Sequence, residues 1–230
     1  MILENIKEVQ ENINAACAKV GRDPSEVTLI AVSKTKPYTM IEEALKSGTL
    51  DYGENKVQEI TEKYEILPKN IRWHMIGHLQ RNKVKYLVGK TAFIHSVDSV
   101  RLAEQIEKEY AKADEIANIL IEVNMAEEES KFGITSTETE EMVREISQFP
   151  HIRIQGLMTI APYTENPETN RGYFRNMKQL SVDISKKNID NVNMSVLSMG
   201  MTGDYQVAIE EGATMVRVGT GIFGERNYNK

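Results

Sequence analysis

The stretch Val27-Thr28-Leu29-Ile30-Ala31-Val32 is followed at once by Ser33-Lys34-Thr35-Lys36-Pro37. An unbroken run of apolar and β-branched residues is typical of a strand that is buried on both faces, as in a parallel sheet. The polar residues and the proline that follow indicate that the strand ends there. A buried strand with a polar segment at its carboxyl end is the unit from which this fold is built.

The same unit recurs along the chain, with a helical segment between each strand and the next. The predicted strands are 27–32, 50–52, 71–76, 92–97, 116–123, 152–158, 193–197 and 214–218. The helices expected between them are 40–46, 54–66, 81–88, 99–113, 137–148, 167–187 and 205–211. This alternation requires a parallel sheet, and eight repeats predict a closed (β/α)8 TIM-type barrel. An open doubly wound sheet is the alternative, but no G-x-G-x-x-G motif follows the first strand.

One more helix is predicted in front of the barrel. Apolar residues recur at helical spacing from Leu3 to Val20, and Gly21 follows as a stop signal. Cys17 lies on this apolar stripe, so we expect a small core residue rather than a reactive thiol. We expect a single domain over 1–230, with the N-terminal helix at 1–21 and the barrel at 26–224.

Composition limits the classes of partner. The 230 residues carry 28 Lys and Arg against 34 Asp and Glu, which gives a net charge of −6. Binding to nucleic acid or to anionic membranes needs a basic surface, so neither partner is expected. No apolar run approaches the ~20 residues of a membrane span, and the acidic N-terminus resembles no targeting peptide. With one cysteine, an intramolecular disulfide is excluded, and we expect a cytoplasmic protein.

Functional residues of such barrels lie at the carboxyl ends of the strands. In chain order these ends read Ser33-Lys34-Thr35-Lys36-Pro37, Gly53-Glu54-Asn55, Gly77-His78-Leu79-Gln80, Ser96-Val97-Asp98, Asn124-Met125, Met158-Thr159-Ile160-Ala161-Pro162, Ser198-Met199-Gly200-Met201-Thr202 and Gly219-Thr220-Gly221. The strands are mostly apolar whereas their ends are polar and rich in glycine. This rim is therefore predicted to hold a ligand.

Two features of the rim narrow the chemistry of that ligand. The turns 198–200 and 219–221 offer backbone N–H groups and hydroxyls in the loops where these barrels commonly bind phosphate, although such glycines can also serve only to close tight turns. Lys34 ends an apolar strand, where partial desolvation would lower the pKa of its amine and favour an imine with a carbonyl. Together these features suggest a phosphorylated aldehyde, of which pyridoxal phosphate (PLP) is the obvious example.

Several long motifs stand in one order along the chain. They are AVSKTKP (31–37), GEN (53–55), WHMIGHLQRNK (73–83), GLM (156–158), LSMGM (197–201) and VRVGTGIFG (216–224). Together they resemble the pyridoxal phosphate homeostasis protein family, whose barrel is similar to the N-terminal domain of alanine racemase. The resemblance covers nearly the whole chain. Thr202 departs from it, because a serine is usual at this position.

The resemblance implies a role for each of eight residues. Lys34 would carry PLP as a covalent imine, whereas the neighbouring Lys36 would not. Asn55 would contact the hydroxyl side of the pyridine ring, and His78 would lie beside the ring. The phosphate would be held by Ser198, Gly219 and Thr220, with help from the amide of Met199. Arg217 would approach the pyridine nitrogen.

A metal ion is not expected. His74 and His78 have a spacing typical of helical metal sites, but Gly77 interrupts the helix that such a pair needs. Arg217 has a different chemical consequence, because a guanidinium only donates hydrogen bonds and leaves the pyridine nitrogen unprotonated. The ring is then a weaker electron sink than one paired with a carboxylate.

Three functions follow as hypotheses. The first is a non-catalytic PLP carrier that takes part in PLP homeostasis and supplies apo-enzymes, and we expect it to be a monomer. The second is an amino-acid racemase, whose relatives carry a second domain with a catalytic tyrosine. Because the sequence ends at Lys230, shortly after its last predicted strand, we expect no such domain here. The third is a barrel that binds no ligand. The first is favoured.

Overall fold

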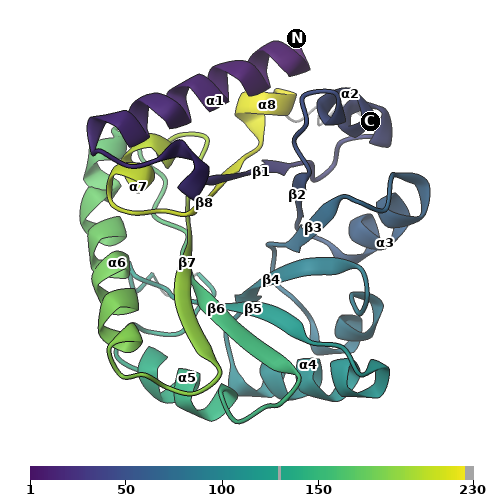
Figure 1. The fold of residues 1–230 in the computed structure, drawn as a ribbon, viewed down its shortest axis with the longest axis vertical. Coiled ribbons are helices and arrows are strands. Elements are labelled where there is room, and N and C mark those ends of the chain that lie inside the picture. The colour runs from purple at the N-terminus through teal and green to yellow at the C-terminus, as the bar shows by residue number, and fades with distance from the viewer. Residues whose placement is uncertain (129–130, 226–230) are drawn as a thin grey trace.

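Eight strands form a closed parallel barrel in chain order, as Figure 1 shows. The computed structural model describes residues 1–128 and 131–225. The strands are β1 (Thr28–Val32), β2 (Asp51–Glu54), β3 (Arg72–Met75), β4 (Thr91–Val97), β5 (Ala117–Glu122), β6 (Ile152–Met158), β7 (Val192–Met201) and β8 (Met215–Val218). Pairing between β1 and β8 closes the ring, with Ile30 opposite Arg217. The predicted TIM-type barrel is confirmed.

The helices lie around the outside of the ring of strands (Figure 1). The α-helices are α1 (Ile2–Lys19), α2 (Tyr38–Leu45), α3 (Val57–Ile66), α4 (Val100–Ala113), α5 (Thr139–Ile146), α6 (Arg171–Ser185), α7 (Tyr205–Glu210) and α8 (Thr220–Phe223). Three 3₁₀ helices are η1 (Pro24–Glu26), η2 (Arg81–Tyr86) and η3 (Pro167–Asn170). The additional N-terminal helix α1 packs against α7 and α8. None of the helices within 1–128 and 131–225 has the length and apolar character needed to cross a membrane.

Differences from the sequence-based prediction include the following elements. Within the predicted helix 81–88, residues 81–86 form the 3₁₀ helix η2 instead. In this geometry residues three apart eclipse, and both Val84 and the following Leu87 are buried. Strand β7 continues to Met201, beyond its predicted end. The last helical turn, α8, is absent from the prediction, since Gly219-Thr220-Gly221 reads as a loop.

The strands separate two buried regions of different composition: the layer between strands and helices, and the space inside the ring. Apolar side chains fill the layer between strands and helices, and Cys17 is fully buried there, which confirms its assignment to the core. The space inside the ring is more polar. Buried charged and polar side chains project from the strands into it, and its polar network consists of Asp51, His74, His95, Ser198 and Arg217. Because the polar residues alternate with apolar ones, both interiors come from the same strands.

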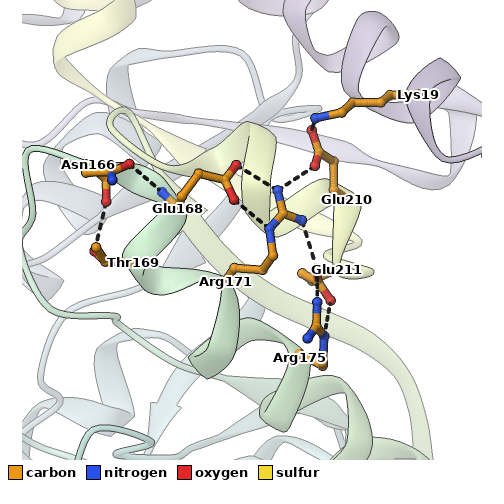
Figure 2. A network of polar contacts seen from close by, with 8 residues as sticks. All are labelled: Lys19, Asn166, Glu168, Thr169, Arg171, Arg175, Glu210 and Glu211. Carbon is orange, nitrogen blue, oxygen red and sulfur yellow. Dashed lines mark hydrogen bonds and ion pairs between the residues drawn. The ribbon is translucent and has the colours of Figure 1, made fainter.

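A network of ion pairs ties α1, α6 and α7 together outside the barrel (Figure 2). Arg171 contacts Glu168 at 2.7 Å, Glu210 at 2.7 Å and Glu211 at 2.9 Å. Lys19, at the end of α1, contacts Glu210 at 2.7 Å. Hydrogen bonds that Arg171 donates to Glu168, Glu211 and Glu210 raise the pKa of its guanidinium. The network fixes the helices beside β7 and β8, whose carboxyl ends form part of the polar rim.

Candidate functional site

The predicted site residues lie on five strands that are consecutive in the closed ring. They are Lys34 after β1, Asn55 after β2, His78 after β3, Ser198 and Met199 in β7, Arg217 in β8, and Gly219 and Thr220 at the start of α8. The closed order places β7 and β8 beside β1, although they are the last strands in the sequence. The barrel therefore assembles these residues from both ends of the chain at one rim.

Lys34 lies in a tight loop, two residues beyond the end of β1, and its side chain is half-buried. Both neighbours of Lys34 are anchored. The Ser33 hydroxyl donates to Glu54 Oε1 at 2.6 Å, and the Thr35 amide donates to Glu59 Oε2 at 2.7 Å. Thr35 adopts a left-handed φ of 63°, which turns the chain sharply after Lys34. The loop thus holds the lysine in one place at the rim.

A buried ion pair supports this loop from below. Lys63 Nζ contacts Glu54 Oε1 at 2.7 Å and Glu59 Oε2 at 3.1 Å, and it donates to the Ser33 carbonyl at 2.9 Å. Burial raises the pKa of Glu54 to about 7, and Lys63 acts in the opposite direction. Among the described residues, Glu54 Oε2 has no hydrogen-bond partner. The ammonium of Lys63 is therefore the main compensation for the buried carboxylate.

The side chain of Lys36 is held by backbone carbonyl groups at the end of α8. Lys36 lies outside β1, so the alternation of a strand does not determine its direction. Its ammonium donates at 3.0 Å to each of the carbonyl oxygens of Phe223, Gly224 and Glu225. Cations stabilise the carbonyl end of a helix, and here Lys36 binds the end of α8. Lys36 thus joins the loop of Lys34 to the last helical turn.

Arg217 lies inside the barrel with 4% of its surface exposed. It donates to the Ser198 hydroxyl and, at 2.9 Å, to the Thr159 carbonyl. Burial lowers the pKa of Arg217 to about 10, and Glu122 and Asp204 partly offset this shift. The guanidinium stays charged at neutral pH. Within the described part of the chain, these two contacts use two of its five N–H donors.

Backbone donors converge at the start of α8. The amides of Gly219 and Gly221 point to the hydroxyl of Thr202 at 3.3 Å and 3.5 Å, which are long contacts. A neutral hydroxyl thus occupies donors that an anion would accept more strongly. A side chain at position 221 would crowd Val218 and Thr202, at 3.1 Å and 3.2 Å. The donor set suits a phosphate group.

Ser198 and Met199 are both more enclosed than the sequence suggests. The Ser198 side chain is fully buried, and its hydroxyl contacts Arg217 and His95 rather than the donors at α8. Met199 is also fully buried, at a place where the register between β7 and β8 shifts. A direct contact of either residue with phosphate stays a prediction, and Thr202 is better placed for that role.

His78 and Asn55 flank an open groove on the β2 and β3 side of the rim. Its volume is about 480 Å³, and its lining residues are Asn55, Lys56, Val57, Gln58, His78, Gln80 and Lys83. The His78 ring stacks on Phe132 with 4.0 Å between ring centroids. A Cβ at Gly77 would lie 2.4 Å from the Asn55 carbonyl oxygen, so only glycine permits this approach. Both predicted residues therefore lie at an accessible surface.

The two histidines of the supposed metal motif are separated by the fold. His74 is buried inside the barrel with 1% exposure, whereas His78 is at the rim. Within residues 1–128 and 131–225, no cluster of three or more His, Cys, Asp or Glu side chains could bind a metal ion.

Sequence reasoning assigns no role to five residues of the site and its support: Glu54, Lys63, His95, Glu122 and Thr202. Glu54 falls in a predicted helix and is the last residue of β2. Period-two alternation along 94–97 and 117–122 could have indicated that His95 and Glu122 face the barrel interior. No local signal in the sequence connects Lys63 with the loop of Lys34, because that contact arises only from tertiary packing.

Comparison with known proteins gives consistent results. A family model described as the alanine racemase N-terminal domain matches residues 5–227. A pyridoxal phosphate homeostasis protein from Aquifex aeolicus is 45% identical over 226 residues, which are 98% of each chain. PipY of Synechococcus elongatus PCC7942, solved with PLP bound, has a TM-score of 0.84 and 30% identity, covering 97% of this chain and all of PipY.

A fourth comparison concerns the fold alone. Alanine racemase of Clostridium difficile 630 has a TM-score of 0.76 at 14% identity. The match covers 98% of this chain but 58% of the racemase. The barrel with its N-terminal helix is thus the shared architecture.

Removing the cation beneath the lysine loop tests how that loop is held. Lys63→Met should lower the free energy of unfolding by about 3 kcal/mol, because it leaves the buried Glu54 carboxylate without its partner. Glu54→Gln in the same chain should restore most of the loss, since no buried charge then remains unpaired. Urea denaturation measures both effects. A double variant as unstable as the single one would exclude this role for the pair.

The carboxyl group of Glu122 predicts a pH dependence of stability. Burial, and to a smaller extent the nearby Asp98, raise its pKa from 4.5 to about 7, while Arg217 acts in the opposite direction. Between these values the folded protein keeps a proton that the unfolded chain has lost, so stability falls as pH rises from 4.5 to 7. Relative to Glu122→Gln, the wild type should lose about 3 kcal/mol over this range. If urea denaturation showed the same change in stability with pH for the wild type and Glu122→Gln, the raised pKa of Glu122 would be contradicted.

Proposed function

The chain belongs to the pyridoxal phosphate homeostasis protein family, and we propose that it binds PLP at the carboxyl rim of its barrel through an imine with Lys34. The observation that carries the proposal is the joining of β1 to β8. This pairing brings a half-buried amine, a buried guanidinium and the donors at the start of α8 to neighbouring strands. The PLP-bound form of PipY, at 30% identity, supports the same ligand.

Each part of the ligand has a matching group in this proposal. Lys34 takes the aldehyde, and the amides of Gly219 and Gly221 with the hydroxyls of Thr202 and Thr220 take the phosphate. Another N–H of Arg217 faces the pyridine nitrogen. Asn55 and His78 contact the remaining edge and face of the ring. Ser198 acts by holding Arg217 rather than by binding the phosphate.

Chemically, bound PLP supplies an electrophilic aldehyde and an aromatic ring that can accept electrons. Arg217 weakens the second property. Its guanidinium stays charged, since its pKa is about 10, and it donates to the ring nitrogen instead of protonating it. This arrangement favours holding the aldehyde over stabilising a carbanion. We therefore assign storage of PLP and its delivery to apo-enzymes as the function. We also propose that the protein acts in the cytoplasm as a monomer with one domain.

A racemase also needs a second acid–base group, and the tyrosines near the site are poorly placed for that role. Tyr52 is fully buried and packs on Trp73, with 6.0 Å between ring centroids. Burial raises the pKa of Tyr52, so its phenol is a poor acid–base group near neutral pH. Tyr163 is 94% exposed in the segment before η3. Neither tyrosine supports racemisation, which remains the alternative function.

Reductive labelling tests the lysine. Treatment of the PLP-loaded protein with borohydride should fix the label on Lys34, and Lys34→Ala should abolish both the label and the visible imine absorption. Lys36→Ala is the matched control, because this neighbouring amine is bonded to α8 and its loss should leave the label in place at saturating PLP. Peptide mapping identifies the labelled residue. A label on Lys36 in the wild type would refute the assignment.

Affinities for PLP and for unphosphorylated pyridoxal separate the phosphate contacts from the ring contacts. Losing one hydroxyl to a phosphate costs ~1.5–3 kcal/mol, so Thr202→Ala and Thr220→Ala should each weaken PLP binding about tenfold to a hundredfold. Neither should affect pyridoxal. Ser198→Ala should weaken both ligands alike, since it acts through Arg217. Equal effects of all three substitutions on pyridoxal would refute this division.

Incubation with L-alanine in deuterated water separates the carrier from the racemase. Each positioned acid–base group typically contributes about 10²–10⁴ in rate, so a site that lacks one should racemise poorly. Chiral analysis should find negligible D-alanine, with at most slow α-deuteration from the chemistry of PLP itself. Turnover at ~1 s⁻¹ or faster, in the ordinary range of enzymes, would replace the carrier function by the alternative.

A further inference from the structure

A continuous chain of hydrogen bonds crosses the interior of the barrel. Asp51, the first residue of β2, contacts His74 Nε2 at 3.0 Å. His74 Nδ1 lies 2.8 Å from His95 Nε2, and His95 Nδ1 lies 2.9 Å from the Ser198 hydroxyl. Ser198 in turn accepts from Arg217. All five side chains are buried, so these contacts replace water for each of them.

The chemistry of the groups fixes the direction of this chain. Burial raises the pKa of the Asp51 carboxyl, but hydrogen bonds from His74 and Arg72 lower it below its usual value, so Asp51 is ionised and only accepts. His74 Nε2 must therefore carry a hydrogen. Burial also lowers the pKa of His95 well below its usual value, and nearby His74 and Arg217 lower it further. His95 is neutral and has a single N–H.

Two directions remain: either His95 donates to Ser198, or Ser198 donates to His95. The hydrogen bonds of Ser198 distinguish between them. Arg217 has no acceptor, so Ser198 must accept from it. If His95 also donated to Ser198, the serine's own hydrogen would have no acceptor, because this hydroxyl has no third partner among the described residues. Ser198 therefore donates to His95 Nδ1. His95 Nε2–H then donates to His74 Nδ1, and His74 Nε2–H donates to Asp51.

We infer that Asp51, His74, His95 and Ser198 are positioning residues that hold Arg217 in a fixed orientation toward the pyridine ring. The inference rests on the proposed function, because the ring is that of PLP. Each bond runs from the cation toward the anion, so the bonds polarise one another in the same sense. The Ser198 hydroxyl and the Thr159 carbonyl each accept a hydrogen bond from the guanidinium. These two bonds fix its orientation inside the barrel.

The ligand-free protein allows a direct test of the direction. Long-range ¹H–¹⁵N NMR of the imidazole rings should show both His74 and His95 as neutral Nε2–H tautomers. An Nδ1–H on either ring would overturn the inference. This measurement needs no PLP, so it remains decisive if the wild type fails to bind the cofactor, an outcome that would instead refute the proposed function.

Substitution at the far end of the chain tests its effect on the ligand. Asp51→Asn can present an N–H to His74, so both histidine tautomers should become mixed. The absorption maximum of bound PLP should shift, and its affinity should fall about fivefold, as for the loss of one ordinary hydrogen bond. Arg72→Gln is the matched control, because it removes the other partner of Asp51 and leaves the acceptor in place.

The control should keep wild-type tautomers, absorption and affinity. Should Asp51→Asn fail to fold, the wild-type and Arg72→Gln NMR spectra still decide the direction of the chain. A folded Asp51→Asn protein with unchanged tautomers and an unchanged absorption maximum would overturn the positioning role. The same holds if Arg72→Gln changes the absorption as much as Asp51→Asn does, because a general disturbance of the barrel would then explain both.

Discussion

Pairing between the first and the last strand is the constraint on which the rest of this structure depends. The ladder from Thr28 opposite Met215 to Ala31 opposite Val218 closes the barrel and sets the height of Arg217 relative to the loop of Lys34. A change of one residue in this register would turn Arg217 away from the interior, because the side chains of a strand alternate between faces. The pairing that closes the barrel therefore also sets the geometry of the candidate site.

The interior of the barrel shows how charged groups are accommodated in such a small space. Burying a polar group without a partner is costly, and burying an isolated charge is more so. Asp51 and Arg217 lie at opposite ends of a series of neutral groups, each of which both accepts and donates. At Glu54, by contrast, the ammonium of Lys63 and the hydroxyl of Ser33 both donate to the same carboxylate oxygen. Both arrangements lie directly behind groups assigned to the ligand.

The sequence is sufficient for the fold and for the position of the rim. The repeated unit of an apolar strand followed by a polar end predicts the closed barrel, and Lys34, Arg217 and Thr220 lie at or beside strand ends. The contacts of individual side chains are harder to predict from the sequence. The sequence does not indicate that Lys36 binds the end of α8, or that the hydroxyl of Ser198 contacts Arg217 and His95. Contacts of Lys63 depend on packing between distant segments, which no local pattern records.

The contact between Lys36 and the end of α8 links positions 187 residues apart at its first acceptor, Phe223. Contacts of such long sequence separation carry a large loop-closure entropy, and the structure between them must organise before they become favourable. Until the strands between them pair, the lysine loop and the turn at α8 have no fixed position relative to each other. In folding terms, the assembled rim is a property of the finished protein. A partly folded chain therefore lacks the geometry that the proposed PLP site requires.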